Sequence, residues 1–363
     1  MRVLITVLDW GLGHATRCIP VVRELQRRSC TVSIAGNGDS LALLKREFPG
    51  LAYFELPAYD PVYSSRGSLA IKMALQIPKF LKAIKQEHRV VQSLIQTENF
   101  NLIISDNRYG CWSESVPSIF LSHQLNIQIP RELKWLSKPL NRIHTGLVNK
   151  FSACWIPDYP DAENNLSGDL SRIDETLSTP VVHIGPLPRF EYMNERTTEY
   201  DIVCILSGPE PQRSIFEEMV VSQLESSALR YIVVRGVVTK VPGAIPNTVG
   251  FLNSEDLQDV ISKSSVVIAR SGYSTIMDLV ALRKRAIVVP TPGQTEQEYL
   301  AKRWSERGIL QGMSQEDFDL EAAMNALERF IGFGESDKAS SQLLINELDR
   351  LLKDKSHSLS IST

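Results

Sequence analysis

Short apolar runs alternate with segments of helical periodicity along most of the chain. Runs at residues 2–8, 31–35 and 51–56 are separated by stretches in which apolar side chains recur every three or four positions. Strands and helices that alternate in this way build a parallel sheet with helices on both faces. The pattern therefore predicts an α/β domain with a doubly wound sheet.

The alternation weakens after the first domain and then begins again. Residues 157–198 are rich in Pro, Asn, Gly and Asp and contain few periodic segments, as is typical of a connection between domains. A length of 363 residues also favours two domains of ordinary size over one. The predicted division is a first domain at 1–160, a connection at 161–198, a second α/β domain at 199–335 and a closing helix at 336–352.

The strongest chemical signal lies between residues 264 and 301. A buried strand ends at a tight turn, residues 270–272, and a helical pattern starts at Tyr273. The first N–H groups of a helix have no partner within the helix and lie at the positive end of its dipole, so they bind anions. Hydroxyl groups in the same turn add further donors. The predicted phosphate site consists of Arg270, Ser271, Gly272, Ser274 and Thr275.

Groups suited to sugar hydroxyls flank this phosphate site. Asp278 follows one helical turn later, over the same opening, and a second strand leads to a helix that carries Glu296 and Gln297. Carboxylate and amide groups accept and donate the hydrogen bonds that hydroxyls need. A sugar bound beside the phosphate is the interpretation that these residues favour.

Another glycine turn follows the first strand of the chain. Gly11 and Gly13 precede His14, which opens the next helix. The dinucleotide-binding pattern also has a third glycine and an acidic residue after the second strand. This chain lacks both, so a dinucleotide is not indicated. Because the helix dipole disfavours a cation at this end, we predict a neutral His14 that accepts a proton. The alternative is that His14 only caps the turn.

Polar residues also follow two other strands of the first domain. Asp106 and Arg108 come after one strand, and His123 and Gln124 come after the next. The carboxyl ends of parallel strands meet at one edge of the sheet, so these residues are expected near His14. Asp106 is predicted to orient His14 or to bind an acceptor hydroxyl. Ordinary loop hydrogen bonds are the alternative for both pairs.

The second domain offers further candidate contacts to a ligand. A turn from Ser207 and Gly208 to Arg213 joins a strand to a helix, and Arg213 is suited to pair with a phosphate. A solvated Arg213 in a plain loop is the alternative. Arg235, at the end of its strand, and Phe251, beside a turn, are candidates for holding a nucleobase.

The pattern Ser-Gly-x-x-Thr-x-x-Asp from residue 271, followed by a strand and by Gln-Thr-Glu-Gln from residue 294, resembles the donor site of GT-B glycosyltransferases that use nucleotide-sugars. It is most similar to family 28, which includes the peptidoglycan N-acetylglucosaminyltransferase. The resemblance implies two Rossmann-like, doubly wound domains that face a central cleft. The first domain would then bind the acceptor, and the closing helix would pack back on it.

The resemblance also implies roles for single residues. The Ser-Gly turn would hold the diphosphate of the donor, Asp278 the ribose hydroxyls, and Glu296 with Gln297 the sugar. The peptidoglycan enzyme has Gln-Gln where this chain has Gln297-Glu298, so the identity of the donor sugar does not transfer.

The glycine turn at residues 11–14 matches the start of GT-B sugar transferases, where the histidine lies in the cleft near the acceptor. Extended to Arg17 and Cys18, the run also resembles the start of the nucleotide-sugar hydrolase of pseudaminic acid synthesis, in which the same histidine serves a water molecule. A GT-B UDP-sugar epimerase and a sugar-binding protein without activity remain further alternatives.

Composition narrows the class of protein. The chain has 43% hydrophobic and 22% charged residues and a net charge of -3, as in soluble globular proteins, and nothing in these values indicates binding to nucleic acid. Five scattered cysteines without a CxxC spacing indicate neither a disulfide framework nor a zinc site. No apolar run has the length of a membrane span, so we expect a cytoplasmic protein.

One segment suggests contact with a membrane. Residues 131–150 combine an apolar side and a tryptophan with five cations against one acid, and such a helix can lie on an anionic bilayer. Packing against the domain with a solvated cationic face is the alternative. A lipid-linked acceptor would explain a contact of this helix with a membrane.

Together these features predict an inverting, metal-independent glycosyltransferase without a cofactor. His14 would deprotonate the acceptor hydroxyl, and the phosphate site would stabilise the departing diphosphate. The favoured donor is a UDP-sugar carrying a hexose, and a lipid-linked or cell-envelope glycan is a candidate acceptor.

Overall fold

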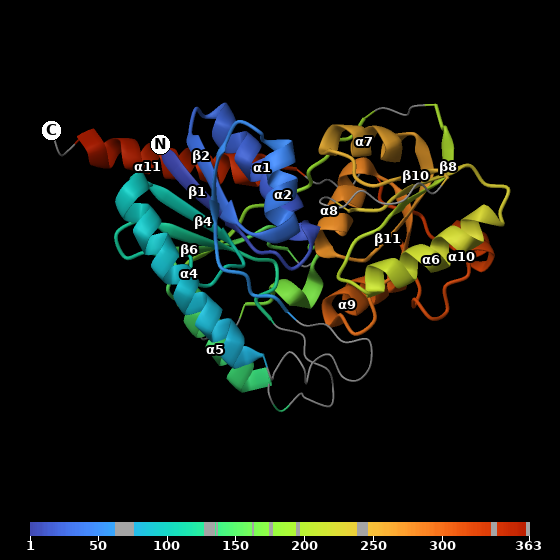
Figure 1. Ribbon diagram of the computed structural model, residues 1–363, viewed down its shortest axis with the longest axis horizontal. Coiled ribbons are helices and arrows are strands. Elements are labelled where there is room, and N and C mark those ends of the chain that lie inside the picture. Colours follow the sequence, from blue (N-terminus) through green and yellow to red (C-terminus); the bar gives the residue numbers. More distant parts are fainter. Residues whose placement is uncertain are drawn as a thin grey trace.

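The computed structural model describes residues 1–61, 76–126, 135, 137–161, 163–173, 177–193, 197–237, 246–334 and 340–360, the last seven by their backbone alone. Within these residues the chain forms two parallel sheets, which appear as two lobes in Figure 1. The first has seven strands in the order β3-β2-β1-β4-β5-β6-β7, and the second has six in the order β10-β9-β8-β11-β12-β13. The predicted α/β class with two doubly wound sheets is confirmed.

The first sheet and its helices span residues 2–183. Their bounds are β1 (Arg2–Val7), α1 (Leu12–Arg27), β2 (Thr31–Gly36), α2 (Gly38–Glu47), β3 (Ala52–Glu55), α4 (Ile77–Glu98), β4 (Leu102–Asp106), β5 (Ser118–Leu121), α5 (Ser137–Val148), β6 (Ala153–Ile156), η2 (Gly168–Ser171) and β7 (Val181–His183). Strand β7 pairs with β6, so the sheet takes its last strand from the segment predicted as the connection.

The second sheet begins at residue 200. Its elements are β8 (Tyr200–Ile205), α6 (Gln212–Glu225), β9 (Tyr231–Val234), β10 (Thr248–Val249), α7 (Ser254–Ser262), β11 (Ser264–Ala269), α8 (Tyr273–Leu282), β12 (Arg285–Val288), α9 (Thr295–Glu306), β13 (Gln311–Gly312), α10 (Leu320–Ala326) and η3 (Leu327–Arg329), followed by the closing helix α11 (Gln342–Ser360).

Two predicted helices are only partly described. Of the segment 131–150, the structure has α5 from Ser137, while 131–134 and 136 lie outside the described residues. The closing helix predicted at 336–352 is α11, which begins at Gln342 and continues to Ser360; residues 336–339 lie outside the described part.

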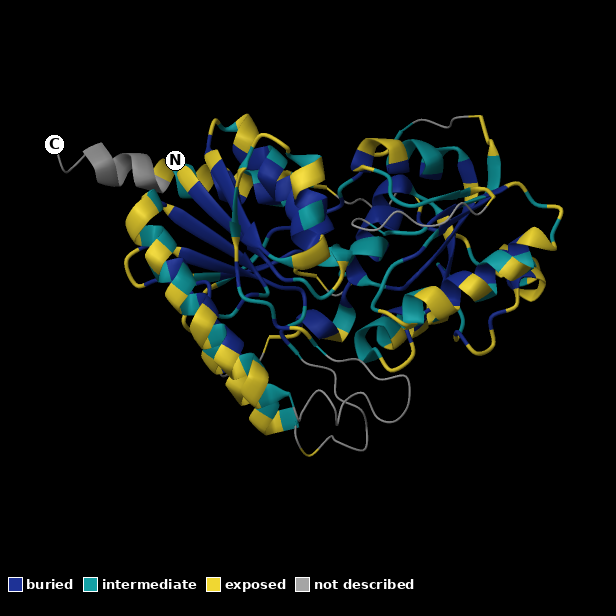
Figure 2. Cartoon of the chain, in the orientation of Figure 1, coloured by how far each residue is buried: buried dark blue, intermediate teal, exposed yellow. Residues whose placement is uncertain are grey.

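The strands are apolar on both faces because helices cover both sides of each sheet. Figure 2 shows the central strands of both lobes as buried, whereas the outward sides of α4 and α6 are exposed. One large cluster of buried side chains includes Ile19 and Val22 of α1 as well as Ile276 and Met277 of α8. The core therefore continues from the first domain into the second through these two helices.

Helix α11 returns to the first domain and packs there, as Figure 1 shows. Leu344 and Leu348 are buried, and the indole Nε1 of Trp155 on β6 donates to Glu347 Oε1 at 3.3 Å. On the other side, Arg28 Nε donates to Asp349 Oδ1 at 2.8 Å. In the described part of the chain, no helix combines the length and the apolar character that crossing a bilayer requires.

Truncating the buried face of α11 should destabilise the first domain. We expect Leu348→Ala to lower the free energy of unfolding by about 2–5 kcal/mol, because it removes a fully buried side chain and leaves a cavity. Urea unfolding followed by tryptophan fluorescence measures the change. Asn346→Ala, on the exposed side of the same helix, is the control; equal losses in the two variants would show that α11 is not packed as described.

Candidate active site

A cavity of about 570 Å³ lies between the two domains. Its walls are the loops that follow β1, β4 and β5 in the first domain and β8, β11 and β12 in the second. In parallel α/β sheets these carboxyl ends are where ligands bind. Predicted site residues that line the cavity are Gly11, Gly13, His14, His123, Gln124, Ser207, Gly208, Phe251, Gly272, Ser274, Thr275, Asp278, Glu296 and Gln297.

His14 and Asp106 meet at the first-domain side of this cavity. The turn before α1 needs glycine at Gly11, whose φ of 109° is unfavourable for other residues, and it brings His14 into the first helical turn. Asp106 ends β4, the neighbour of β1, and its Oδ1 lies 2.5 Å from His14 Nδ1. The carboxylate therefore holds the proton on Nδ1, which leaves Nε2 to accept a proton.

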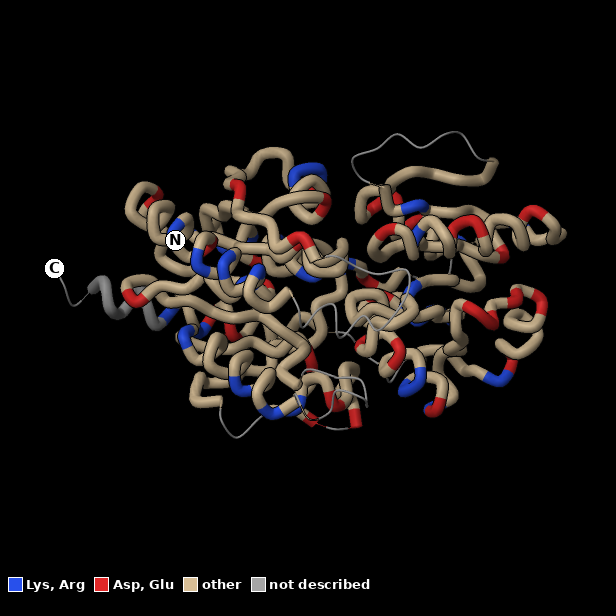
Figure 3. The backbone as a smooth tube through the Cα atoms, turned by 60° about the horizontal axis from the view of Figure 1, so that its bottom comes forward, with Lys and Arg blue, Asp and Glu red and all other residues tan. Residues whose placement is uncertain are grey.

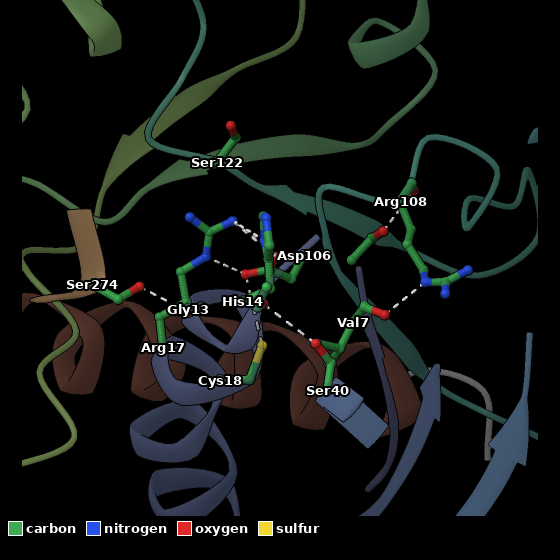
Figure 4. A network of polar contacts seen from close by, with 12 residues as sticks. Val7, Gly13, His14, Arg17, Cys18, Ser40, Asp106, Arg108, Ser122 and Ser274 are labelled. Atoms are coloured by element: carbon green, nitrogen blue, oxygen red, sulfur yellow. Dashed lines mark hydrogen bonds and ion pairs between the residues drawn. The ribbon is translucent and has the colours of Figure 1, made fainter. Parts of the chain in front are cut away.

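Arg17 joins this pair and was missed as a site residue. Its guanidinium faces both oxygens of Asp106, with Nη2 2.8 Å from Oδ1 and Nε bonded to Oδ2. Nη2 also lies 3.0 Å from His14 Nδ1, which cannot accept from it because its proton is donated to Asp106 Oδ1, and Nη1 lies 2.6 Å from His123 Nδ1. Figure 4 shows Arg17 and His14 side by side on α1, both turned toward Asp106. Their spacing of three residues on one helix is the signal that could have revealed Arg17.

Burial and charge set the protonation of this cluster. Burial is the largest influence on the pKa of His14 and lowers it; Asp106 opposes this and Arg17 adds to it, and the net pKa lies below the usual value. Burial raises the pKa of Asp106, but Arg17 and His14 outweigh it and hold that pKa below its ordinary value. Near neutral pH the site therefore contains an ionised Asp106 and a neutral His14.

The two domains also touch across the cavity. Ser274 Oγ donates to the carbonyl oxygen of Gly13 at 2.8 Å, and a side chain at Gly13 would crowd that hydroxyl. His123 Nε2 lies 2.9 Å from Glu296 Oε1, and its ring stacks on Tyr273 with centroids 4.3 Å apart. Residues predicted separately for acceptor and donor are thus in direct contact.

The helix ends that face the cavity are left without caps. Among the described residues, the N-termini of α1 and α8 have no side-chain cap and no acidic residue in the first turn. By contrast, α7 is capped by Asn253 and α10 by Asp319. The uncapped N–H groups of α8, from Gly272 to Thr275, are consequently available to an anion in the cavity.

Asp278 is present in the cavity wall but is already paired. Its Oδ2 accepts from Arg189 Nε at 2.9 Å and its Oδ1 from the Arg189 backbone N–H at 3.1 Å. Burial raises the pKa of Asp278 even though Arg189 opposes the shift. Arg189 also lines the cavity. It lies in the aperiodic connection between the domains, where no sequence pattern indicates it.

Gln297 and Ser271 support the second-domain wall from within. Gln297 Oε1 accepts from the Thr291 N–H at 2.8 Å, and Gln297 Nε2 lies 2.5 Å from Gln294 Oε1. Ser271 Oγ donates to the Gln297 carbonyl at 2.8 Å and is fully buried. Ser271 is not among the described residues that line the cavity. It fixes the turn and does not face a ligand.

Four predicted arginines are also absent from the described residues that line the cavity. Arg213 is paired with Glu210 and Glu217, and Arg235 with the same Glu217. Their charges are therefore neutralised within the second domain.

Arg270 and Arg108 turn into their own domains. Arg270 donates to the carbonyls of residues 289, 290 and 212, and burial lowers its pKa to about 10. Arg108 donates to the Val7 carbonyl at 2.7 Å and pairs with buried Glu87, so that it points away from the His14 cluster in Figure 4.

The first-domain part of the cavity is largely apolar. Trp10 packs against Phe80 and Tyr59, with ring centroids 5.5 and 6.3 Å away, and aliphatic side chains of α4 and α5 continue the wall. Three wall residues carry a buried polar atom that has no hydrogen-bond partner in the described part of the chain. These atoms are Trp10 Nε1, Asn107 Oδ1 and His144 Nε2.

Comparison with known proteins places the chain among sugar transferases. Residues 234–351 match the glycosyltransferase family 28 C-terminal domain. An uncharacterized glycosyltransferase of Methanosarcina acetivorans is 24% identical over 329 residues, which cover 85% of this chain and 84% of the relative.

Two further similarities extend over nearly the whole chain. A UDP-N-acetylglucosamine–N-acetylmuramyl-(pentapeptide) pyrophosphoryl-undecaprenol N-acetylglucosamine transferase of Natranaerobius thermophilus is 22% identical and covers 91% of each chain. The solved structure of the glycosyltransferase SnogD from Streptomyces nogalater superposes with a TM-score of 0.59 at 13% identity, covering 97% of this chain and all of that one. The chain is therefore a glycosyltransferase of the GT-B type, and its residues 234–351 are similar to the C-terminal domain of family 28.

Proposed function

We propose that the protein is an inverting, metal-independent glycosyltransferase that moves a hexose from a UDP-sugar to a hydroxyl group of an acceptor. One observation carries the proposal: His14, held by Asp106, and the uncapped N-terminus of α8 line the same cavity. Transfer from a nucleotide-sugar needs a base that deprotonates the acceptor and an anion-binding site that stabilises the departing diphosphate.

In this reaction His14 Nε2 takes the proton of the acceptor hydroxyl as its oxygen attacks the anomeric carbon. The bond from that carbon to the phosphate oxygen breaks, and the nucleoside diphosphate leaves with the electron pair. Attack from the face opposite the leaving group inverts the anomeric centre. Asp106, ionised and bonded to Nδ1, stabilises the imidazolium that forms.

The donor would lie along the second domain. Its diphosphate would accept hydrogen bonds from the N–H groups of residues 272–275, with the Ser207-Gly208 turn alongside. The ribose would lie at Asp278 and Arg189, and the base near Phe251. The sugar would reach Glu296 and Gln297. The family 28 match includes all of these positions except residues 189, 207 and 208, which supports the assignment.

The acceptor would occupy the apolar part of the cavity. Its rim carries the exposed aliphatic side chains Leu81 of α4 and Ile143 of α5. Figure 3 shows cationic positions along the helices of the first domain. The exposed cations of α4 and α5 are Lys79, Lys82, Lys85, Arg89, Lys138 and Arg142. Exposed apolar side chains at the cavity and exposed cations on the same two helices fit a lipid-linked acceptor in an anionic bilayer.

A nucleotide-sugar hydrolase is the second candidate. The arrangement of His14, Arg17 and Asp106 favours it as well, because a water molecule could replace the acceptor hydroxyl above Nε2. The extended apolar wall argues for the transferase, since water needs no such surface. An epimerase would use the same donor but return an isomerised UDP-sugar.

Turnover of purified protein with UDP-N-acetylglucosamine and other UDP-hexoses distinguishes these functions. We expect little loss of donor alone and release of UDP once a membrane lipid extract is added, with a glycosylated lipid detected by mass spectrometry. His14→Ala should lower kcat by about 10²- to 10⁴-fold, the usual contribution of a general base, without changing the affinity for UDP.

His88→Ala is the matched control, because His88 is a first-domain histidine that is not among the described residues lining the cavity. Rapid donor hydrolysis without acceptor would favour the hydrolase, and isomerised donor the epimerase. Full activity of His14→Ala would exclude His14 as the base.

The pH profile should report the state of His14. Because its pKa is lowered, the neutral form persists below pH 6.5, and kcat/KM should fall only as the pH drops through that lowered pKa. Asp106→Asn removes the charge that raises the pKa, so the acid limb should move to still lower pH while kcat falls. An acid limb that Asp106→Asn leaves unmoved would contradict this assignment.

Membrane contact can be tested by sedimentation with lipid vesicles. We expect binding to phosphatidylglycerol vesicles and little binding to phosphatidylcholine, weakened by salt and by Lys82→Glu with Arg142→Glu, since each cation near an anionic surface contributes about 1 kcal/mol. Lys302→Glu, an exposed change on the second domain, is the control. Equal binding by all three proteins would count against a membrane role for α4 and α5.

A further inference from the structure

We propose that His123, a residue of the first domain, is a positioning residue for the donor sugar. Held by Arg17, it orients the Glu296 carboxylate, so that the sugar-binding part of the donor site is assembled from both domains. The inference rests on the proposed function, because it concerns the sugar that Glu296 is taken to bind.

His123 reaches out of its own domain. It follows β5, yet its Nε2 lies 2.9 Å from Glu296 Oε1 on α9, and its ring stacks on Tyr273, the first residue of α8, at an interplanar angle of 11°. Tyr273 in turn donates its hydroxyl to the Pro157 carbonyl at 2.7 Å. The imidazole is 95% buried between two elements of the second domain.

Arg17 decides which nitrogen of His123 carries the proton. An arginine can only donate, so Nη1, at 2.6 Å, requires an unprotonated Nδ1 on His123. The ring proton then resides on Nε2 and is donated to Glu296 Oε1. Arg17 cannot move away, because Asp106 binds it through both oxygens. A continuous chain of contacts thus runs from the base pair to Glu296.

The consequence for Glu296 is a fixed orientation. Burial raises the pKa of Glu296, but His123, His14 and Arg17 together outweigh it and keep that pKa below its ordinary value, so the carboxylate is ionised. One oxygen is taken by His123; the other has no hydrogen-bond partner among the described residues and can accept from a sugar hydroxyl. A carboxylate held in one direction accepts a hydrogen bond from a sugar hydroxyl of one configuration. With a sugar of the other configuration, the carboxylate oxygen is left without a donor. His123 therefore affects which sugar binds, although it lies outside the second domain.

Three variants separate this role from a general structural one. His123→Phe keeps a ring to stack on Tyr273 but removes both hydrogen bonds, His123→Gln keeps an N–H that can reach Glu296, and Glu296→Gln removes the charge. His88→Phe is the matched control, since His88 also stacks on an aromatic ring, that of Trp112 at 4.4 Å, outside the described cavity wall.

Calorimetric titration with UDP and with UDP-N-acetylglucosamine, UDP-glucose and UDP-galactose provides the measurement. For His123→Phe we expect UDP affinity within about twofold of the parent. The affinity of the preferred UDP-sugar relative to UDP should fall about tenfold, the effect of losing a hydrogen bond to a charged group. Preference among the three sugars should narrow in the same variant. Glu296→Gln should show the same loss of relative affinity. Combining it with His123→Phe should add little to that loss, and His123→Gln should retain most of the preference among the sugars.

Two results would overturn the inference alone. One is an unchanged sugar preference in His123→Phe, and the other is an equal loss of affinity for UDP and for every UDP-sugar, which would mark His123 as a structural support. If the parent protein bound no UDP and no UDP-sugar, the proposed function itself would be rejected together with the inference.

Discussion

The buried pair of Arg17 and Asp106 is the interaction on which the active site depends. A charge taken out of water is tolerated only when its hydrogen bonds are replaced, and here each ion satisfies the other through two contacts. Because both side chains are locked, the two histidines beside them have fixed protons: His14 carries its proton on the nitrogen facing Asp106, and His123 on the nitrogen facing the second domain. One ion pair thereby holds the proposed base and is linked through His123 to the proposed donor side.

This arrangement requires that the domains stay close. The contact of Ser274 with Gly13 and that of Tyr273 with Pro157 join the first turn of α8 to the first domain, and the shared apolar core lies beneath them. Arg189 extends the link, since its side chain binds Asp278 while its carbonyl accepts from Arg23 of α1 at 3.1 Å. Several groups that bound the cavity are therefore held by contacts between the two domains.

Much of this could be predicted from the sequence, for a geometric reason. Parallel strands end at one edge of a sheet, so residues after different strands, such as Asp106 and His123, are brought together whatever the loops do. The directions of long side chains were harder to predict. Arg213 and Arg270 stand beside the phosphate loops, yet nearby carboxylates and carbonyls satisfy them first. Arg189 lies in a segment without periodicity, and no local pattern identifies it. Asp106 and His123, which contact Arg17, are 89 and 106 residues away from it in the sequence, so these contacts are recognised only in the folded chain.

The two uncapped helix ends have an energetic consequence for the contact between the domains. The first turns of α1 and α8 touch through Gly13 and Ser274, so two positive dipole ends lie close together. Their mutual repulsion opposes the approach of the domains, and a diphosphate placed there would cancel it. A bound nucleotide would then stabilise the contact between the domains by RT ln(1 + [L]/Kd), where [L] is the nucleotide concentration. The ligand would thereby become a structural component of the domain contact as well as a substrate.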